Sequence, residues 1–473
     1  MVRNWNFRKA VVSRADLPEH HRLAQTLSWP HLVALGVGAI VGTGILTLIG
    51  VGAGKAGPAV ILSFAIAGVI CACAALAYAE VATMIPASGS AYTYSYVVFG
   101  ELLAWMIGVA LILEYSLVVS AVAVGWSGYA AGFLERIGFA LPHALIQGPE
   151  LGGIVNLPAM FIIWVVAGLL IAGTRESATL NAVLVLVKLA ALALFIAVAL
   201  PVFDSANFTP FMPNGFPRSG AAGSEVGVMA AAAIIFFAFY GFDAIATAAE
   251  EARNPGRDLA IGIVGSMVLC VAIYMLVAAA AIGAVPVQSF ARSAEPLALV
   301  LSEIGQPWAA RLLGASAVIA LPTVILAFFY GQSRIFFTVA RDGLLPPVLA
   351  RVSSRGTPVR ITLFTAAVVS VVAGIFPLDE IAALANAGTL AAFIAVCAAM
   401  LVLRRREPHA ERLFRAPLPW LVGLGGIAGC LYLFYSLPLK TQLFFLVAQA
   451  IGVALYWLYG HGAAARARAA GAA

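Results

Sequence analysis

Charged residues are scarce in this sequence. Aspartate, glutamate, lysine and arginine together make up 10% of its 473 residues, hydrophobic residues make up 63%, and the mean hydropathy is +1.01. A soluble protein of this length needs many more polar side chains to cover its surface. The composition therefore excludes a soluble globular protein and predicts a chain that is surrounded by membrane lipid.

Residues that bind metals or form disulfides are also few. The five cysteines lie inside apolar stretches, and an odd number of such thiols predicts neither a disulfide framework nor a metal cluster. The six histidines lie outside the centres of these stretches. The sequence has no ATP-binding motif, because Gly54 and Lys55 are not followed by Ser or Thr. We therefore expect no metal and no cofactor. An intramembrane enzyme is disfavoured, because no nucleophile stands beside a base.

Basic residues give the chain a formal net charge of +6, which by itself could indicate a nucleic acid partner. Their distribution argues against one. With the N-terminus inside, 20 of the 27 lysines and arginines fall on the cytoplasmic side of the apolar stretches, 6 fall outside, and Lys188 lies within a stretch. This asymmetry follows the positive-inside rule. It predicts a multi-pass protein of the inner membrane with both termini in the cytoplasm and with no nucleic acid partner.

Apolar stretches long enough to cross about 30 Å of hydrocarbon recur along the chain. They predict an all-α polytopic membrane protein with about twelve transmembrane helices. The predicted spans, numbered in chain order, cover residues 31–53, 58–83, 99–133, 157–173, 179–202, 227–251, 259–285, 304–340, 359–377, 380–403, 417–437 and 441–459. Spans 3 and 8 are long enough to require tilt or extension beyond the bilayer. The expected domains are a cytoplasmic N-terminal segment (1–30), a transport core (31–403), a cytoplasmic loop with spans 11 and 12 (404–459) and a cytoplasmic tail (460–473).

Spans 1 and 6 contain glycine near mid-membrane. Span 1 carries Gly42 and Gly44, and span 6 carries Gly241 before Asp243. Glycine weakens a helix, and a carboxylate is costly in lipid. Close helix packing is the alternative interpretation for span 1, because small residues at this spacing often mark helix contacts. Spans 1 and 6 correspond if spans 1–5 and 6–10 are inverted repeats, and interrupted helices at corresponding positions indicate a transport site.

Breaks at these positions predict a defined chemistry. Where span 1 breaks at residues 42–44, the first N–H groups of the following half-helix have no acceptor in the helix and favour a carboxylate. At the break in span 6, carbonyls near Phe237, Ala238 and Tyr240 can accept hydrogen bonds from an ammonium. An α-amino acid carries both groups on one carbon, so it is the predicted substrate.

Four motifs resemble those of the amino acid/polyamine/organocation superfamily. They are GAIVGTGI (38–45), SGSAYTY (88–94), FYGFDAIATAAEEARNPGRDL (239–259) and GQSRIFFTVARDGLLPP (331–347), and they occur in the expected order and on the expected sides. Residues 25–405 are most similar to bacterial members of the cationic amino acid transporter family. The resemblance implies the leucine-transporter-type fold, in which five helices are followed by five inverted helices and helices 1 and 6 are broken.

The resemblance also implies a substrate site. The substrate carboxylate is expected near Thr43 and Gly44 and the amine near Ile40 and the carbonyls of span 6. Relatives that accept substrates with long side chains tend to have a small residue near the position of Leu321. The leucine in this chain is therefore expected to favour small neutral amino acids such as alanine over arginine. The expected substrate-binding residues are Ile40, Gly42, Thr43, Gly44, Phe237, Ala238, Tyr240, Asp243 and Leu321.

Three ionisable side chains lie within spans. In sodium-driven relatives of this fold a cation lies between spans 1, 5 and 8, and Lys188 in span 5 can place its own ammonium there. Burial disfavours the charged lysine, so proton gain and loss at Lys188 could couple transport to a pH gradient, with Glu114 as a second proton-coupling candidate. The structural alternatives are a buried ion pair for Glu114 and Lys188 and a helix cap for Asp243.

We therefore predict a secondary active, proton-coupled transporter of L-amino acids that works by alternating access. An exchanger or a uniporter is one alternative, and a channel or a sensor of the same fold is another. The expected partners are the amino acid, protons and membrane lipid, and the sequence does not determine whether an accessory subunit binds.

Overall fold

The computed structural model describes residues 7–8, 27–85, 89–172, 178–221, 225–247, 252–346 and 359–469. Within these ranges the chain is helical, and no β-strand is present apart from isolated bridges. Most of the expected N-terminal segment and Ser88 of the second motif lie outside the described residues. The predicted all-α class is therefore confirmed for the part of the chain that the structure describes.

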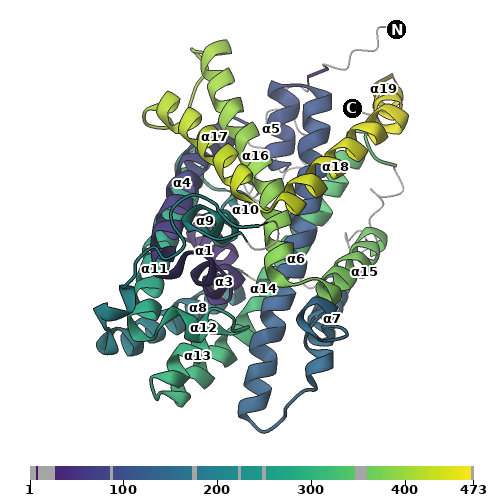
Figure 1. Cartoon of the computed structure of the whole chain (residues 1–473). Coiled ribbons are helices and arrows are strands. Elements are labelled where there is room, and N and C mark those ends of the chain that lie inside the picture. The colour runs from purple at the N-terminus through teal and green to yellow at the C-terminus, as the bar shows by residue number, and fades with distance from the viewer. Residues whose placement is uncertain are drawn as a thin grey trace.

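The spans follow the predicted order (Figure 1). Among the described residues, eight helices are long and apolar enough to cross a membrane, and four more apolar helices are shorter. Span 1 comprises α1 (Trp29–Ile40), α2 (Thr43–Leu46) and α3 (Leu48–Ala56), and span 6 comprises α9 (Val228–Ile235), the 3₁₀ turn η8 (Phe236–Ala238) and α10 (Asp243–Thr247). The other spans are α4 (Val60–Met84), α6 (Glu101–Arg136), α7 (Leu157–Ala172), α8 (Ala178–Ala199), α11 (Pro255–Ala284), α14 (Pro307–Arg341), α15 (Val359–Ile375), α16 (Leu378–Arg406), α17 (Pro419–Ser436) and α18 (Leu439–Leu455).

Short helices between the spans were not predicted. They are α5 (Ser90–Val98) before span 3, α12 (Val287–Phe290) and α13 (Pro296–Glu303) before span 8, and α19 (His461–Ala469) after span 12. The predicted start of span 8 at residue 304 falls at the end of α13, because the chain leaves the helix there and α14 begins with Pro307. A proline at the first helical position favours a new start, which explains this boundary.

The long spans 3 and 8 form the centre of the bundle. Helix α6 has 36 residues and α14 has 35. At 1.5 Å per residue each is about 50 Å long, well beyond the hydrocarbon thickness, as expected. The two helices pack along each other, and α6 also contacts α7, α15 and α16 (Figure 1). The half-helices of spans 1 and 6 lie in the middle of this arrangement, where all eight residues of α9 are buried.

Apolar side chains point outward from the peripheral helices. Phe161 on α7, Leu186 on α8, Phe364 on α15 and Leu421 on α17 are each more than 60% exposed. In water such a surface would aggregate, whereas lipid covers it at no cost. The outer faces therefore fit a multi-pass membrane protein.

A buried ion cluster joins the end of α4 to the segment between α16 and α17. The Glu80 side chain is fully buried, and its carboxylate accepts from Arg404 Nε at 2.6 Å and from Ala416 N at 2.8 Å. Arg412 Nε lies 3.3 Å from the same carboxylate. Because two guanidinium groups compensate the buried charge, this cluster fixes residues that are more than 300 positions apart in the sequence.

Candidate functional site

Span 1 is interrupted after Ile40. Val41 and Gly42 lie outside the helix, and α2 begins at Thr43. The first N–H groups of the new half-helix have no acceptor within it. Thr43 is fully buried, and its hydroxyl has no hydrogen-bond partner in the structure. The break thus presents backbone donors together with one unpaired hydroxyl.

Span 6 is interrupted in a similar way. Helix α9 ends at Ile235, η8 makes one 3₁₀ turn, and α10 begins at Asp243 after an irregular segment of four residues, 239–242. Gly241 has φ +119°, and a Cβ atom there would lie 2.9 Å from the Ala39 carbonyl carbon. Only glycine adopts this conformation readily and allows this approach. Gly241 therefore lets the two breaks lie against each other.

A cavity lies between the breaks and two long helices. It is lined by Ala39, Ile40, Gly42, Thr43 and Gly44 of span 1, Phe237 and Tyr240 of span 6, Val118 and Val122 of α6, and Val324 and Phe328 of α14. Six of the nine residues predicted for the site lie here. Its volume of about 10 Å³ is room for about one water molecule, so a larger ligand requires movement of the walls.

The remaining three predicted residues lie next to this cavity. Ala238 packs against Gly44, and Leu321 lines a neighbouring cavity. The Asp243 carboxylate accepts hydrogen bonds from the Tyr115 hydroxyl at 2.8 Å and from Gly241 N at 3.1 Å. The Asp243 side chain thus joins α6 to the segment that precedes α10, and neither of these two bonds involves an N–H group of α10 itself.

The four lining residues of α6 and α14 were not predicted. Val118 and Val122 are four positions apart on α6, and Val324 and Phe328 are four apart on α14, so each pair shares one helix face. Most positions on both helices are apolar, so hydrophobic periodicity does not mark the inward face, although Glu114 precedes Val118 by four positions and shares its side of α6.

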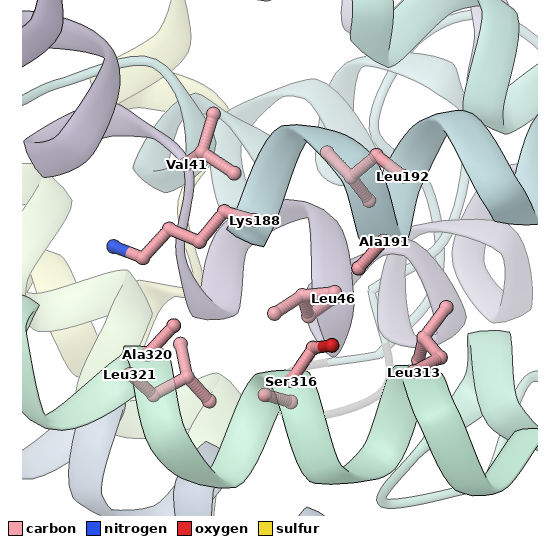
Figure 2. Close-up of a pocket in the computed structure, with 10 residues that line it drawn as sticks. Val41, Leu46, Lys188, Ala191, Leu192, Leu313, Ser316, Ala320 and Leu321 are labelled. Atoms are coloured by element: carbon pink, nitrogen blue, oxygen red, sulfur yellow. The ribbon is translucent and has the colours of Figure 1, made fainter. Parts of the chain in front are cut away.

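Lys188 lies on α8 of span 5 and contacts residues of spans 1 and 8. Its side chain on α8 is 5% exposed, and Nζ donates to the Gly38 carbonyl at 2.9 Å. The adjacent cavity of about 10 Å³ is bounded by Val41, Leu46, Lys188, Ala191, Leu192, Leu313, Ser316, Ala317, Ala320 and Leu321. Figure 2 shows residues of α8 facing residues of α14 across this space.

Glu114 occupies a different part of the core. Its side chain is 1% exposed, and its carboxylate lies beside the Thr389 side chain of α16. It lies close to Asp243, and its Cβ is 3.2 Å from the position of a Cβ built on Gly388 of α16. Glu114 therefore belongs to the surroundings of the break in span 6.

Other spans supply hydrogen-bond donors to the carbonyls at both breaks. The Tyr274 hydroxyl of α11 donates to the Ile40 carbonyl at 2.9 Å. The Asn386 amide of α16 donates to the carbonyls of Ala233 at 2.7 Å and Ile234 at 3.0 Å. Sequence reasoning missed both residues. A buried asparagine within an apolar span is a polar signal that could have marked Asn386.

Comparison with known proteins covers most of the chain. Residues 27–458 match the amino acid permease family model. The chain is 44% identical over 434 residues to the branched-chain amino acid permease BcaP of Bacillus subtilis (strain 168), which covers 90% of this chain and 91% of that protein. It is 41% identical over 441 residues to the methylthioribose transporter of the same organism, covering 92% and 94%. It is 37% identical over 423 residues to cationic amino acid transporter 2, vacuolar, of Arabidopsis thaliana, covering 88% of this chain and 65% of that protein.

Proposed function

The chain belongs to the amino acid permease family, and we propose that it is a proton-coupled symporter of neutral L-amino acids. The observation that carries this proposal is the contact between two helix breaks at one cavity. One break offers backbone donors and the other offers backbone acceptors. A substrate that bears a carboxylate and an ammonium on one carbon satisfies both.

The carboxylate is proposed to bind at span 1. The N–H groups of Thr43 and Gly44 belong to the first turn after the break, and Thr43 adds its unpaired hydroxyl. Backbone donors at a helix start favour an anion through hydrogen bonds and through the helix dipole. Buried donors without a partner are costly, so a carboxylate that fills them gains affinity.

The ammonium is proposed to bind the carbonyls around Ile40, Phe237 and Tyr240. Ile40 ends α1, and the other two residues belong to the break in span 6. The Ile40 carbonyl has already accepted one hydrogen bond from Tyr274, and a carbonyl oxygen can accept a second. An ammonium has three donors, which matches several carbonyls arranged around one point.

The substrate side chain is proposed to be neutral. Among the described residues that line the cavity, none is charged, and Thr43 and Tyr240 are the polar ones. The positive side chain of arginine would lose its hydration there without gaining a counter-ion. One of the two relatives from Bacillus subtilis is named a branched-chain amino acid permease, and this name supports a neutral substrate as well.

Proton coupling is proposed to run through Lys188. Its ammonium donates to the Gly38 carbonyl of α1 near the break, and the stem of its side chain lines a cavity whose other residues are apolar apart from Ser316. Loss of the proton would remove the charge from this contact and thereby shift the balance between access states. Glu114 is the second candidate, because it is buried beside the break in span 6.

Uptake by purified protein in proteoliposomes tests this function. We expect L-alanine to accumulate in sodium-free vesicles under an imposed pH gradient and to be displaced by other neutral amino acids more strongly than by arginine. Counterflow without gradient-driven accumulation would indicate an exchanger or a uniporter. Binding without any flux would indicate a sensor, and flux that does not saturate would indicate a channel.

A further inference from the structure

Asn386 is a buried polar residue for which the proposed transport mechanism has so far no role. It lies on α16, in span 10, and its side chain is fully buried. Its Nδ2 group uses both hydrogens on two successive carbonyls of α9, Ala233 at 2.7 Å and Ile234 at 3.0 Å. These carbonyls lie in the last turn before η8, immediately before the break in span 6.

The Asn386 amide takes the place of two backbone N–H donors. In an uninterrupted α-helix, the carbonyls of Ala233 and Ile234 would accept from the N–H groups of Phe237 and Ala238, four residues later. Those residues form η8, a tighter turn that leads into the break. Buried carbonyls need donors, so a helix can stop here only if other groups supply them. The Asn386 amide supplies two.

Span 1 has a similar side-chain donor near its break. Lys188 Nζ donates to the Gly38 carbonyl, which in an uninterrupted helix would accept from Gly42. Lys188 lies in span 5 and Asn386 in span 10. These are corresponding spans if spans 1–5 and 6–10 are inverted repeats. Each repeat thus uses a side chain of its last span to supply a donor at the break of its first span.

The environment of the Asn386 amide oxygen indicates that the main role of this residue is not to stabilise the fold. Oδ1 is buried without a hydrogen-bond partner in the structure. An unpaired buried acceptor costs free energy, and leucine has a similar volume without that cost. The donor half of the amide is the half that the protein uses.

From these contacts we propose that Asn386 is a positioning residue for the substrate amine. It keeps span 6 from continuing as an α-helix through residues 236–238, so that the carbonyls of Phe237 and Tyr240 stay directed to the cavity. Unlike Lys188, it carries no titratable proton, so it holds the carbonyl side of the site at every pH. This inference rests on the proposed binding of an amino acid between the two breaks.

Binding measurements on purified protein test the role of Asn386. Three probes separate the two ends of the substrate: L-alanine, its methyl ester, which lacks the carboxylate, and propionate, which lacks the amine. In Asn386→Leu we expect the dissociation constants of alanine and the ester to rise about tenfold, as for loss of one hydrogen bond to a charged group. We expect the inhibition constant of propionate to change less than about twofold.

Two further variants make the test decisive. Asn386→Asp keeps the shape but donates at most one hydrogen, so it too should weaken alanine and the ester if Asn386→Leu does not fold. Ser63→Ala removes another buried bond between spans, from Ser63 Oγ to the Val228 carbonyl (2.8 Å) at the far end of α9, and should leave all three constants unchanged.

The outcomes distinguish this inference from the proposed function. If Asn386→Leu weakens the binding of all three probes equally, the residue has a general structural role and the inference is overturned. The inference is also overturned if Asn386→Leu and Asn386→Asp both bind alanine with the affinity of the wild type. If the wild type binds none of the common amino acids, the proposed function itself fails, and the inference fails with it.

Discussion

Gly44 of span 1 lies directly against Ala238 of span 6. A Cβ atom built on Gly44 would be 2.3 Å from the Ala238 Cα and 2.6 Å from its Cβ. Non-bonded carbon atoms do not approach to such distances. The two half-helices therefore come this close only because residue 44 has no side chain. Close helix packing, the alternative interpretation for this glycine, is therefore present, and the same packing brings the two breaks to one cavity.

Gly44→Ala is expected to weaken alanine binding tenfold or more, because the added methyl group pushes α2 away from η8 at a cost of about 1–3 kcal/mol. Equilibrium binding on purified protein measures this. Gly168→Ala on α7 is the control, because a Cβ there meets nothing within 4 Å. Wild-type affinity in Gly44→Ala would show that the breaks do not need this contact.

Lys188→Gln is expected to lose pH-driven accumulation of alanine but to keep counterflow exchange, because the variant lacks the titratable proton and its amide can still donate to the Gly38 carbonyl beside the break in span 1. The two assays are run on the same proteoliposomes. Lys55→Gln is the matched control, because Lys55 Nζ also donates to a backbone carbonyl, that of Glu225, but lies at the end of α3. Sodium-dependent accumulation that ignores pH would contradict coupling through Lys188.

Leu321→Gly is expected to admit longer side chains. A Cβ atom on Gly42 would lie 3.9 Å from Leu321 Cδ2, so this leucine separates the break in span 1 from the cavity beside Lys188. Competition assays should show the affinity of long amino acids rising about tenfold relative to alanine. Leu313→Gly, which enlarges the same cavity two turns away, should not change this ratio, and an equal shift in both variants would contradict the assignment.

Membrane topology can be checked with single cysteines in a background without the five native ones. Arg406 ends α16 and Ser219 lies beyond the other end of the bundle, and both are exposed. The asymmetry of basic residues predicts that a cysteine at 406 reacts only from the cytoplasm and a cysteine at 219 only from outside. Labelling of both from one side would refute the predicted arrangement.

Glu80→Gln is expected to destabilise the protein by about 3–5 kcal/mol, because it leaves two guanidinium groups without their buried counter-charge. Thermal unfolding in detergent measures the loss as a lower midpoint. Glu380→Gln removes the exposed pair with Lys440 (2.9 Å) and should change the midpoint little. Equal midpoints in the two variants would mean that the Glu80 cluster contributes nothing to stability.

Local properties of the sequence were enough to predict the class, the order of the spans and the positions of the breaks. A span is recognised by the length of its apolar stretch, and a break by glycine at mid-membrane, so neither depends on what lies across the bundle. Gly42, Gly44 and Gly241 therefore marked the candidate site without any knowledge of the fold. Lys188 stood out for a similar reason, since one lysine in an apolar span is conspicuous.

The tertiary structure alone decided which side chains meet at the breaks. Val118 and Phe328 line the cavity because of how α6 and α14 are rotated, and the hydrophobic periodicity of a mostly apolar helix does not predict its rotation. The partners of the broken backbone, Tyr274 and Asn386, lie more than 150 positions from the carbonyls they bind. In lipid, apolar faces have no preference between neighbouring helices and solvent, so close packing and hydrogen bonds between distant segments select the arrangement.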